Sequence, residues 1–212
     1  MPHDDRVTLP GFPSLTSLPA TEHPDLVAVP VAAALAGWPG ANEVAVVDID
    51  PDLADTAAMS EAYDIPMTAS GNCVVVSGAR AGDERIAACV VRADTRADVN
   101  PLVRKMLDVR KASFLPMERA VEETGMEYGG ITPVGLPDGW RLLVHDALLT
   151  EPVVVIGSGV RRSKLLVPGR LLADLPGAEV VAVLGRCSGL TEVRREAACG
   201  RRWRRGPGCP GG

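Results

Sequence analysis

The stretch that decides the fold class is NCVVVSGARAGDERIAACVVRA, residues 72–93. It holds two apolar runs, residues 72–77 and 85–93, separated by the glycine- and charge-bearing segment GARAGDE. Two such runs joined by a turn of this composition predict an antiparallel β-hairpin. A hairpin in the middle of the chain favours a mixed sheet over a strict alternation of parallel strands and helices.

Helical and strand patterns continue on both sides of this hairpin. Helices are predicted at residues 26–38, 52–63, 98–108, 116–124 and 169–175 from apolar spacing and from the placement of prolines. Further strands are predicted at residues 43–50, 141–145, 152–156, 163–167 and 178–184. The order of elements predicts an α/β domain of the α+β kind.

The two ends differ in composition from the body. The chain has 212 residues, of which 46% are apolar, enough for one domain with a core. Residues 1–24 are rich in proline and lack periodicity, which predicts a flexible N-terminal arm. Residues 185–212 carry seven arginines and two glutamates without an apolar pattern, which predicts a disordered basic tail. The domain itself is therefore expected at residues 25–184.

Charge and motifs exclude several function classes. The formal net charge is −5, and because the tail contributes +5, residues 1–184 carry −10. Such a body argues against a broad nucleic-acid-coating surface but leaves room for a small basic track beside a pocket. No apolar run approaches the roughly 20 residues of a membrane helix, and no signal peptide is visible, so a cytoplasmic protein is expected.

Cofactor and metal motifs are also missing from the sequence. It contains no Walker A loop, no GxGxxG behind a strand and no GxSxG elbow. The five cysteines form no CxxC, and His145 is the only histidine of the body, too few ligands for a zinc site. No metal and no cofactor are therefore predicted. His145 could act as a base, or it could be an exposed residue at a strand end.

Two glycine clusters stand out, GGITPVG at residues 129–135 and GSG at residues 157–159. Glycine lets the backbone approach a ligand closely, and Pro133 stiffens its loop. A rigid loop that offers backbone N–H groups to a ligand has this composition, and so do ordinary surface turns. On turn chemistry alone, Ser158 is a turn residue rather than a nucleophile.

A series of segments carries a resemblance to a known family. In chain order it consists of residues 72–76 (NCVVV), 98–100 (DVN), 109–114 (VRKASF), 120–125 (AVEETG), 130–135 (GITPVG), 145–146 (HD) and 157–159 (GSG). This series resembles the YbaK/prolyl-tRNA editing domain family over about residues 52–183. Members hydrolyse mischarged aminoacyl-tRNA, either as free-standing proteins or as insertions in prolyl-tRNA synthetase. The resemblance implies a mixed, curved sheet surrounded by helices.

The resemblance also implies a site. Its pocket would lie between the sheet and the loop 130–135, with the 157–159 turn along it. The residues expected to act in catalysis are Asn72, Gly130 and Gly135. Those expected to bind substrate are Ile131, Thr132, Pro133, Asp146, Gly157, Ser158 and Gly159. Many members have a lysine where this chain has Asn72, which supplies no positive charge. Asn72 is therefore interpreted either as a site residue or as a strand-end cap.

Two basic clusters are candidates for a phosphate track along the tRNA. One contains Arg104, Lys105, Arg110 and Lys111, and the other contains Arg161, Arg162 and Lys164. The alternative for both is a solvated surface.

The leading hypothesis is an aminoacyl-tRNA deacylase, a hydrolase that serves translation fidelity and binds the acceptor end of aminoacyl-tRNA. Water would attack the ester carbonyl while loop backbone amides stabilise the oxyanion. Two alternatives remain, a non-catalytic aminoacyl-tRNA or nucleotide-binding relative and a regulatory or interaction protein on the same fold. A homodimer is left open.

Overall fold

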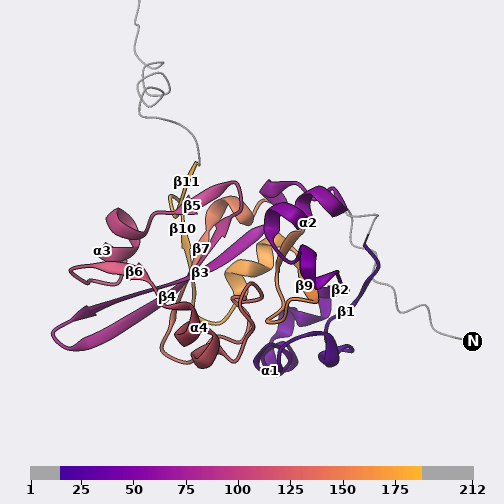
Figure 1. Cartoon of the computed structure of the whole chain (residues 1–212), viewed down its shortest axis with the longest axis horizontal. Coiled ribbons are helices and arrows are strands. Elements are labelled where there is room, and N and C mark those ends of the chain that lie inside the picture. The colour runs from indigo at the N-terminus through magenta and orange to yellow at the C-terminus, as the bar shows by residue number, and fades with distance from the viewer. Residues whose placement is uncertain (1–14, 188–212) are drawn as a thin grey trace, which may run out of the picture.

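The computed structural model describes residues 15–187 of the chain, and its strands form three sheets (Figure 1). The first sheet has the order β1-β2-β9-β8, the second β10-β7-β4-β3-β6, and the third pairs β11 with β5. The strands are β1 Ser17–Pro19, β2 Ala45–Asp48, β3 Gly71–Arg80, β4 Asp83–Arg92, β5 Thr95–Ala97, β6 Ala112–Phe114, β7 Arg141–His145, β8 Val154–Gly157, β9 Ser163–Val167, β10 Ala178–Val181 and β11 Gly185–Cys187.

The helices are short and lie between the strands. The α-helices are α1 Val29–Gly37, α2 Thr56–Tyr63, α3 Arg104–Met106 and α4 Met117–Thr124. A π-helical turn, Val99–Val103, leads directly into α3. Single 3₁₀ turns occupy Pro24–Leu26, Pro39–Glu43, Pro51–Leu53, Met67–Ala69, Asp146–Leu148 and Gly169–Asp174. Within residues 15–187 no helix is long and apolar enough to cross a membrane.

The predicted hairpin is present and is longer than expected. Strands β3 and β4 pair antiparallel from Gly71 opposite Arg92 to Arg80 opposite Asp83. Only Ala81 and Gly82 remain in the turn, both with positive φ (54° and 92°). Two-residue turns with two positive φ angles match the twist of paired strands, so the pairing continues to the turn. The seven-residue loop expected from the GARAGDE composition was therefore wrong.

The five-stranded sheet is mixed. Strands β10, β7 and β4 run parallel to one another, whereas β3 and β6 run antiparallel to their neighbours. The four-stranded sheet is antiparallel throughout. An α+β class with mixed pairing is confirmed, and the strands divide between two larger sheets and a two-stranded ribbon.

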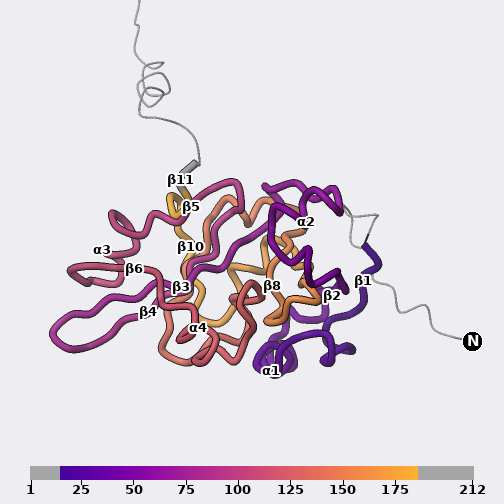
Figure 2. Tube along the Cα trace, in the orientation of Figure 1, coloured from indigo at the N-terminus to yellow at the C-terminus, as the bar shows by residue number. Residues whose placement is uncertain are grey.

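The two large sheets meet where β3 begins. Ser70 forms a parallel bridge with Val155 of β8, and a Cβ on Gly71 would lie 3.1 Å from Ile156 and 3.3 Å from Val154. Figure 2 shows the chain entering β3 beside α2 and running to the hairpin tip at the opposite end of the molecule. A side chain at Gly71 would therefore crowd the side chains of Ile156 and Val154 at this junction.

The central parts of the two large sheets are buried on both faces, which explains the uninterrupted apolar runs in the sequence. In β4, Ala88 and Val90 face the core shared with α1, whereas Ala87, Cys89 and Val91 face a second cluster. In β2, Val46 faces the shared core, while Ala45 and Val47 pack under α2 with Met59. The successive residues alternate between faces as strand geometry requires.

Four strands lie where none was predicted. Strands β1 and β11 fall within the segments assigned to the arm and the tail, and each is three residues long and pairs at a sheet edge or in a ribbon. Strands β5 and β6 are equally short. A three-residue strand shows too little of the two-residue period for its sequence to identify it. Residues 1–14 and 188–212, with most of the predicted arm and tail, lie outside the described residues.

Candidate active site

A cavity of about 660 Å³ lies where the two large sheets meet α2 and α4. Its walls come from the start of β3, the end of β8, Lys164 of β9, the N-terminus of α2 and the loop at residues 128–131. Because these segments are far apart in the sequence, the cavity exists only in the folded chain. Its volume falls in the range of pockets that hold small ligands.

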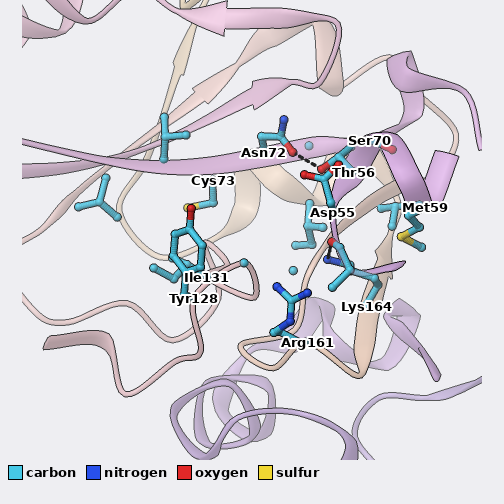
Figure 3. Close-up of a pocket in the computed structure, with 18 of the residues that line it drawn as sticks. Asp55, Thr56, Met59, Ser70, Asn72, Cys73, Tyr128, Ile131, Arg161 and Lys164 are labelled. Carbon is cyan, nitrogen blue, oxygen red and sulfur yellow. Dashed lines mark hydrogen bonds between the residues drawn. The ribbon is translucent and has the colours of Figure 1, made fainter. Parts of the chain in front are cut away.

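The buried cation of this cavity is Lys164. Lys164 is only 6% exposed, and its Nζ donates a 2.9 Å hydrogen bond to the carbonyl oxygen of Ala54 (Figure 3). The pKa of Lys164 is lowered to about 8, mainly by burial and to a smaller extent by the charge of Arg161, while Asp55 opposes the shift. A group with this pKa is mostly protonated at pH 7, so the cavity holds a positive charge.

The start of α2 and the start of β3 meet through Asn72. Thr56 Oγ1 donates a 2.7 Å hydrogen bond to Asn72 Oδ1. The Asp55 carboxylate accepts from the backbone N–H of Ala57 at 3.0 Å and caps α2. Figure 3 places Asp55, Thr56, Ser70 and Asn72 together on the side of the cavity that α2 and β3 form. This side therefore offers hydroxyl, amide and carboxylate groups.

The two glycine clusters pack against each other, backbone to backbone. The N–H of Gly159 donates to the carbonyl of Gly130 at 2.8 Å, and the N–H of Gly130 donates to Glu127 at 2.9 Å. A Cβ at Gly157 would overlap the Gly130 carbonyl and lie 2.7 Å from that of Ile131. Gly157 is also the register partner of Lys164 on β9. The glycines thus let the loop pack against the end of β8, next to the strand that carries Lys164.

Comparison with known proteins assigns the chain to a family. The sequence model described as the aminoacyl-tRNA editing domain matches residues 50–175, more than half of the chain. The chain belongs to the aminoacyl-tRNA editing domain family. That match contains every segment that lines the cavity. No curated protein matches the chain.

Solved structures show the same fold. A protein named as a "putative trans-editing enzyme for prolyl tRNA synthetase" is 21% identical with a TM-score of 0.61, covering 72% of this chain and 93% of that one. The hypothetical protein APE2540 is 23% identical with a TM-score of 0.59, covering 66% and 90%. A structure from work on epitope grafting onto scaffold proteins is 23% identical with a TM-score of 0.62, covering 76% and 96%.

Of the residues expected in catalysis and substrate binding, the editing domain brings Asn72, Ile131 and Gly157 to the cavity. Gly130 lies behind its wall, where a Cβ would be 2.8 Å from the backbone of Val160. Gly135 lies against α1, where a Cβ would overlap the carbonyl of Pro30.

Four further residues of the two glycine clusters are buried and do not line the cavity. Ser158 Oγ donates to the carbonyl of Ser163 at 2.9 Å, a turn contact. Thr132 is fully buried, and its Oγ1 has no hydrogen-bond partner in the described part of the chain. Pro133 is buried beside it, and Gly159, with φ 85°, packs against Ala28 of the segment before α1.

The pair His145 and Asp146, at the end of β7, lies outside the cavity lining. Asp146 does not line the cavity, and its carboxylate lies 3.7 Å from His145 Nε2. His145 is 6% exposed, so the expectation of an exposed strand-end residue was wrong. Desolvation by burial lowers the pKa of His145, and its Nδ1 has no hydrogen-bond partner among the described residues. His145 is therefore a buried side chain that does not line the cavity, so it is not the base of this site.

The two basic clusters differ in their relation to the site. Arg161 and Lys164 line the cavity, whereas Arg162 is exposed outside it and donates to the carbonyl of Asp25. Arg161 Nη2 donates to the carbonyl of Pro51 at 2.8 Å, which holds its guanidinium at the cavity. The other cluster, Arg104, Lys105, Arg110 and Lys111, lies on and after α3 and does not line the cavity.

Several cavity residues were not predicted. Asp55 and Thr56 carry a detectable signal, because an Asp-Thr pair before an apolar run marks a helix start. Ser70, Cys73 and Tyr128 carry none, since only the approach of the two sheets and the loop brings them to one cavity. Within residues 15–187, no three His, Cys, Asp or Glu side chains converge as a metal site would require.

Proposed function

We propose that this editing domain hydrolyses the ester that joins a mismatched amino acid to the terminal ribose of a tRNA. The observation that carries the proposal is the buried ammonium group of Lys164. It lines a cavity whose residues all lie within the segment that matches the family. An ester hydrolase needs a charge or donor aimed at the carbonyl oxygen, and a desolvated cation is an effective one.

Lys164 would stabilise the oxyanion. An ammonium group has three N–H donors, and one of them is directed at the carbonyl of Ala54. The other donors can reach a ligand in the cavity. Because the residue is buried, little water screens its charge, and attraction to a developing oxyanion is stronger than at the surface.

The reaction balances with water as the only other reactant. The water oxygen bonds to the ester carbonyl carbon, the bond from that carbon to the ribose oxygen breaks, and the ribose oxygen takes up a proton. The products are a free amino acid and an uncharged tRNA. Asp55, whose carboxylate lines the cavity, is the acceptor that we assign to orienting the water. A ribose hydroxyl next to the ester is the second acceptor.

A non-catalytic aminoacyl-tRNA-binding protein is the second candidate. The observation that favours it is Asn72, which is uncharged and already accepts a hydrogen bond from Thr56 where the resemblance places a lysine. The two candidates differ in the role of Lys164. In a hydrolase it acts on the transition state, whereas in a binder it contributes only to affinity.

The test is release of amino acid from a panel of misacylated tRNAs by the full chain and by Lys164→Met. We expect at least one tRNA to be deacylated, and kcat to fall about 10²- to 10³-fold in the variant, as for loss of an oxyanion donor. Lys105→Met is the matched control for kcat, because Lys105 is exposed on α3 outside the cavity, where loss of a phosphate contact would raise KM and leave kcat unchanged. Unchanged kcat in Lys164→Met would refute the hydrolytic role of Lys164, and tight binding without release on every tRNA would favour the binder.

A further inference from the structure

Exposed apolar side chains gather at the mouth of the cavity. Among residues 15–187, the exposed large apolar side chains are Val29, Phe114, Met117, Tyr128, Val180 and Val183. Three of them, Phe114, Met117 and Tyr128, line the cavity. They come from β6, α4 and the loop before Gly129, so no single amphipathic element accounts for their exposure.

The exposed aromatic side chains of the described residues are both found at this cavity. The whole chain has only seven phenylalanine, tyrosine and tryptophan residues. Within the described residues, Phe114 and Tyr128 are the exposed aromatics, at 61% and 62%, and both are at this mouth. Trp38, in contrast, is buried in the core. Leaving a ring in water at a cavity is unfavourable unless a ligand covers it, so such positions mark binding surfaces.

A cation lies next to the aromatic rim. Arg161 reaches the cavity from the turn after β8, and its backbone N–H is held by the Glu127 carboxylate at 2.6 Å. A Cβ on Gly129, the neighbour of Tyr128, would lie 2.8 Å from Arg161 Nη1. Figure 3 shows the Tyr128 ring at the side of the cavity and the Arg161 guanidinium directed into it. An aromatic face beside a fixed guanidinium matches a ligand with a flat base and an anionic phosphate.

We propose that Phe114, Met117 and Tyr128 form a stacking surface for the unpaired 3′-terminal base of tRNA, with Arg161 on its phosphate. The assignment rests on the proposed function, because it is the aminoacylated end that has to enter the cavity. Single-stranded nucleotides are bound by stacking on aromatic side chains and by basic groups along the backbone. The rim would hold the base while the ester reaches Lys164 further inside, where the cavity wall is buried.

The experiment measures binding of uncharged tRNA, which has no ester, so its outcome does not depend on hydrolysis. Two tRNAs are compared, one intact and one lacking only its 3′-terminal adenosine, at fixed low salt by fluorescence anisotropy. We expect Tyr128→Ala and Phe114→Ala to weaken binding of the intact tRNA about five- to 150-fold, the effect of losing one stacked base. The parent and the variants should bind the shortened tRNA with equal affinity, because this tRNA lacks the base that stacks on the ring.

Two controls separate stacking from other effects. Tyr128→Phe should bind intact tRNA as the parent does, because the ring and not the hydroxyl stacks. Val183→Ala removes an equally exposed apolar side chain away from the cavity and should change nothing. Parental affinity of Tyr128→Ala and Phe114→Ala for intact tRNA would overturn the proposal, as would an equal loss for both tRNAs. A third result would also overturn it: sedimentation shows that the parent is a dimer, and Tyr128→Ala dissociates this dimer without changing the affinity for tRNA.

Discussion

Replacing Lys164 by methionine changes how the stability of the fold depends on pH. In the parent, burial places the pKa of Lys164 at about 8, while an unfolded chain has an ordinary lysine pKa near 10.4. Between these two values the unfolded chain binds one more proton than the folded chain. The free energy of unfolding therefore rises with pH across this window, and below pH 8 the folded chain carries the full cost of the buried charge.

The magnitude follows from the two pKa values. Each pH unit inside the window is worth about 1.4 kcal/mol, so a window of about 2.5 units corresponds to about 3 kcal/mol in total. Between pH 7 and pH 9.5, where part of the window has been crossed, the gain for this one group is about 2 kcal/mol. Methionine has a similar length and does not titrate, so Lys164→Met should lack this gain.

The assay is chemical denaturation of parent and variant at pH 7 and at pH 9.5. The quantity of interest is the difference between the two pH increments, because other titrating groups, such as the thiols of Cys73 and Cys89, are present in both proteins and cancel. We expect the parent's increment to exceed that of Lys164→Met by about 2 kcal/mol. Equal increments would show that Lys164 titrates at an ordinary pKa, and the argument for a desolvated cation would fail.

The same pKa fixes the sign of the pH dependence of catalysis. If the protonated Lys164 stabilises the oxyanion, kcat/KM should fall as pH rises through about 8, after subtraction of uncatalysed ester hydrolysis. If the neutral amine acted as a base, kcat/KM would rise through the same pH. A rising profile would thus refute the cationic role even if Lys164→Met is inactive.

Other predictions concern the frame of the site. Gly135→Ala should cost about 3 kcal/mol or more in denaturation, because φ is 79° and the Cβ would overlap a backbone carbonyl, whereas Gly139→Ala, with φ 83° and open space, should cost only about 1–2 kcal/mol. Thr56→Val should cost about 1 kcal/mol, because Asn72 Oδ1 loses its donor; no cost would show that water replaces it. Cys89, fully buried with its pKa raised by burial to about 12, should resist thiol reagents at pH 8 until the chain unfolds, as mass spectrometry of labelled peptides would report.

Elements that contain a clear apolar run were predictable from the sequence, and elements of only three residues were not. The strands at residues 141–145 and 163–167 have the predicted bounds, because each contains an apolar run, residues 142–144 and 165–167, that is bordered by polar or proline residues. The segment 98–108 was predicted as one helix, but it forms a π-turn followed by three α-helical residues and ends at Asp108, whose φ is 54°. Apolar spacing does not distinguish a wide turn from an α-turn over so few residues.

The glycine clusters illustrate how far sequence reasoning reached into the site. Their composition indicated a close approach, and the backbones of Gly130 and Gly157 do approach each other closely. What they approach is mostly one another, and only part of each cluster lines the cavity. A single sequence shows which residues lack a Cβ but not which neighbour requires its absence.

Lys164 shows why the charge of the site could not be predicted without the three-dimensional structure. The resemblance directed attention to residue 72, at the start of β3, and an asparagine there suggested a cavity without a cation. The cavity is bounded on one side by β3 and on the other by β8 and β9, so a charge can enter from either sheet. Here it enters from β9, beside Gly157, which has no side chain to cover it. An uncharged residue 72 therefore does not decide between enzyme and binder. The protonation state and the kinetic role of Lys164 decide it.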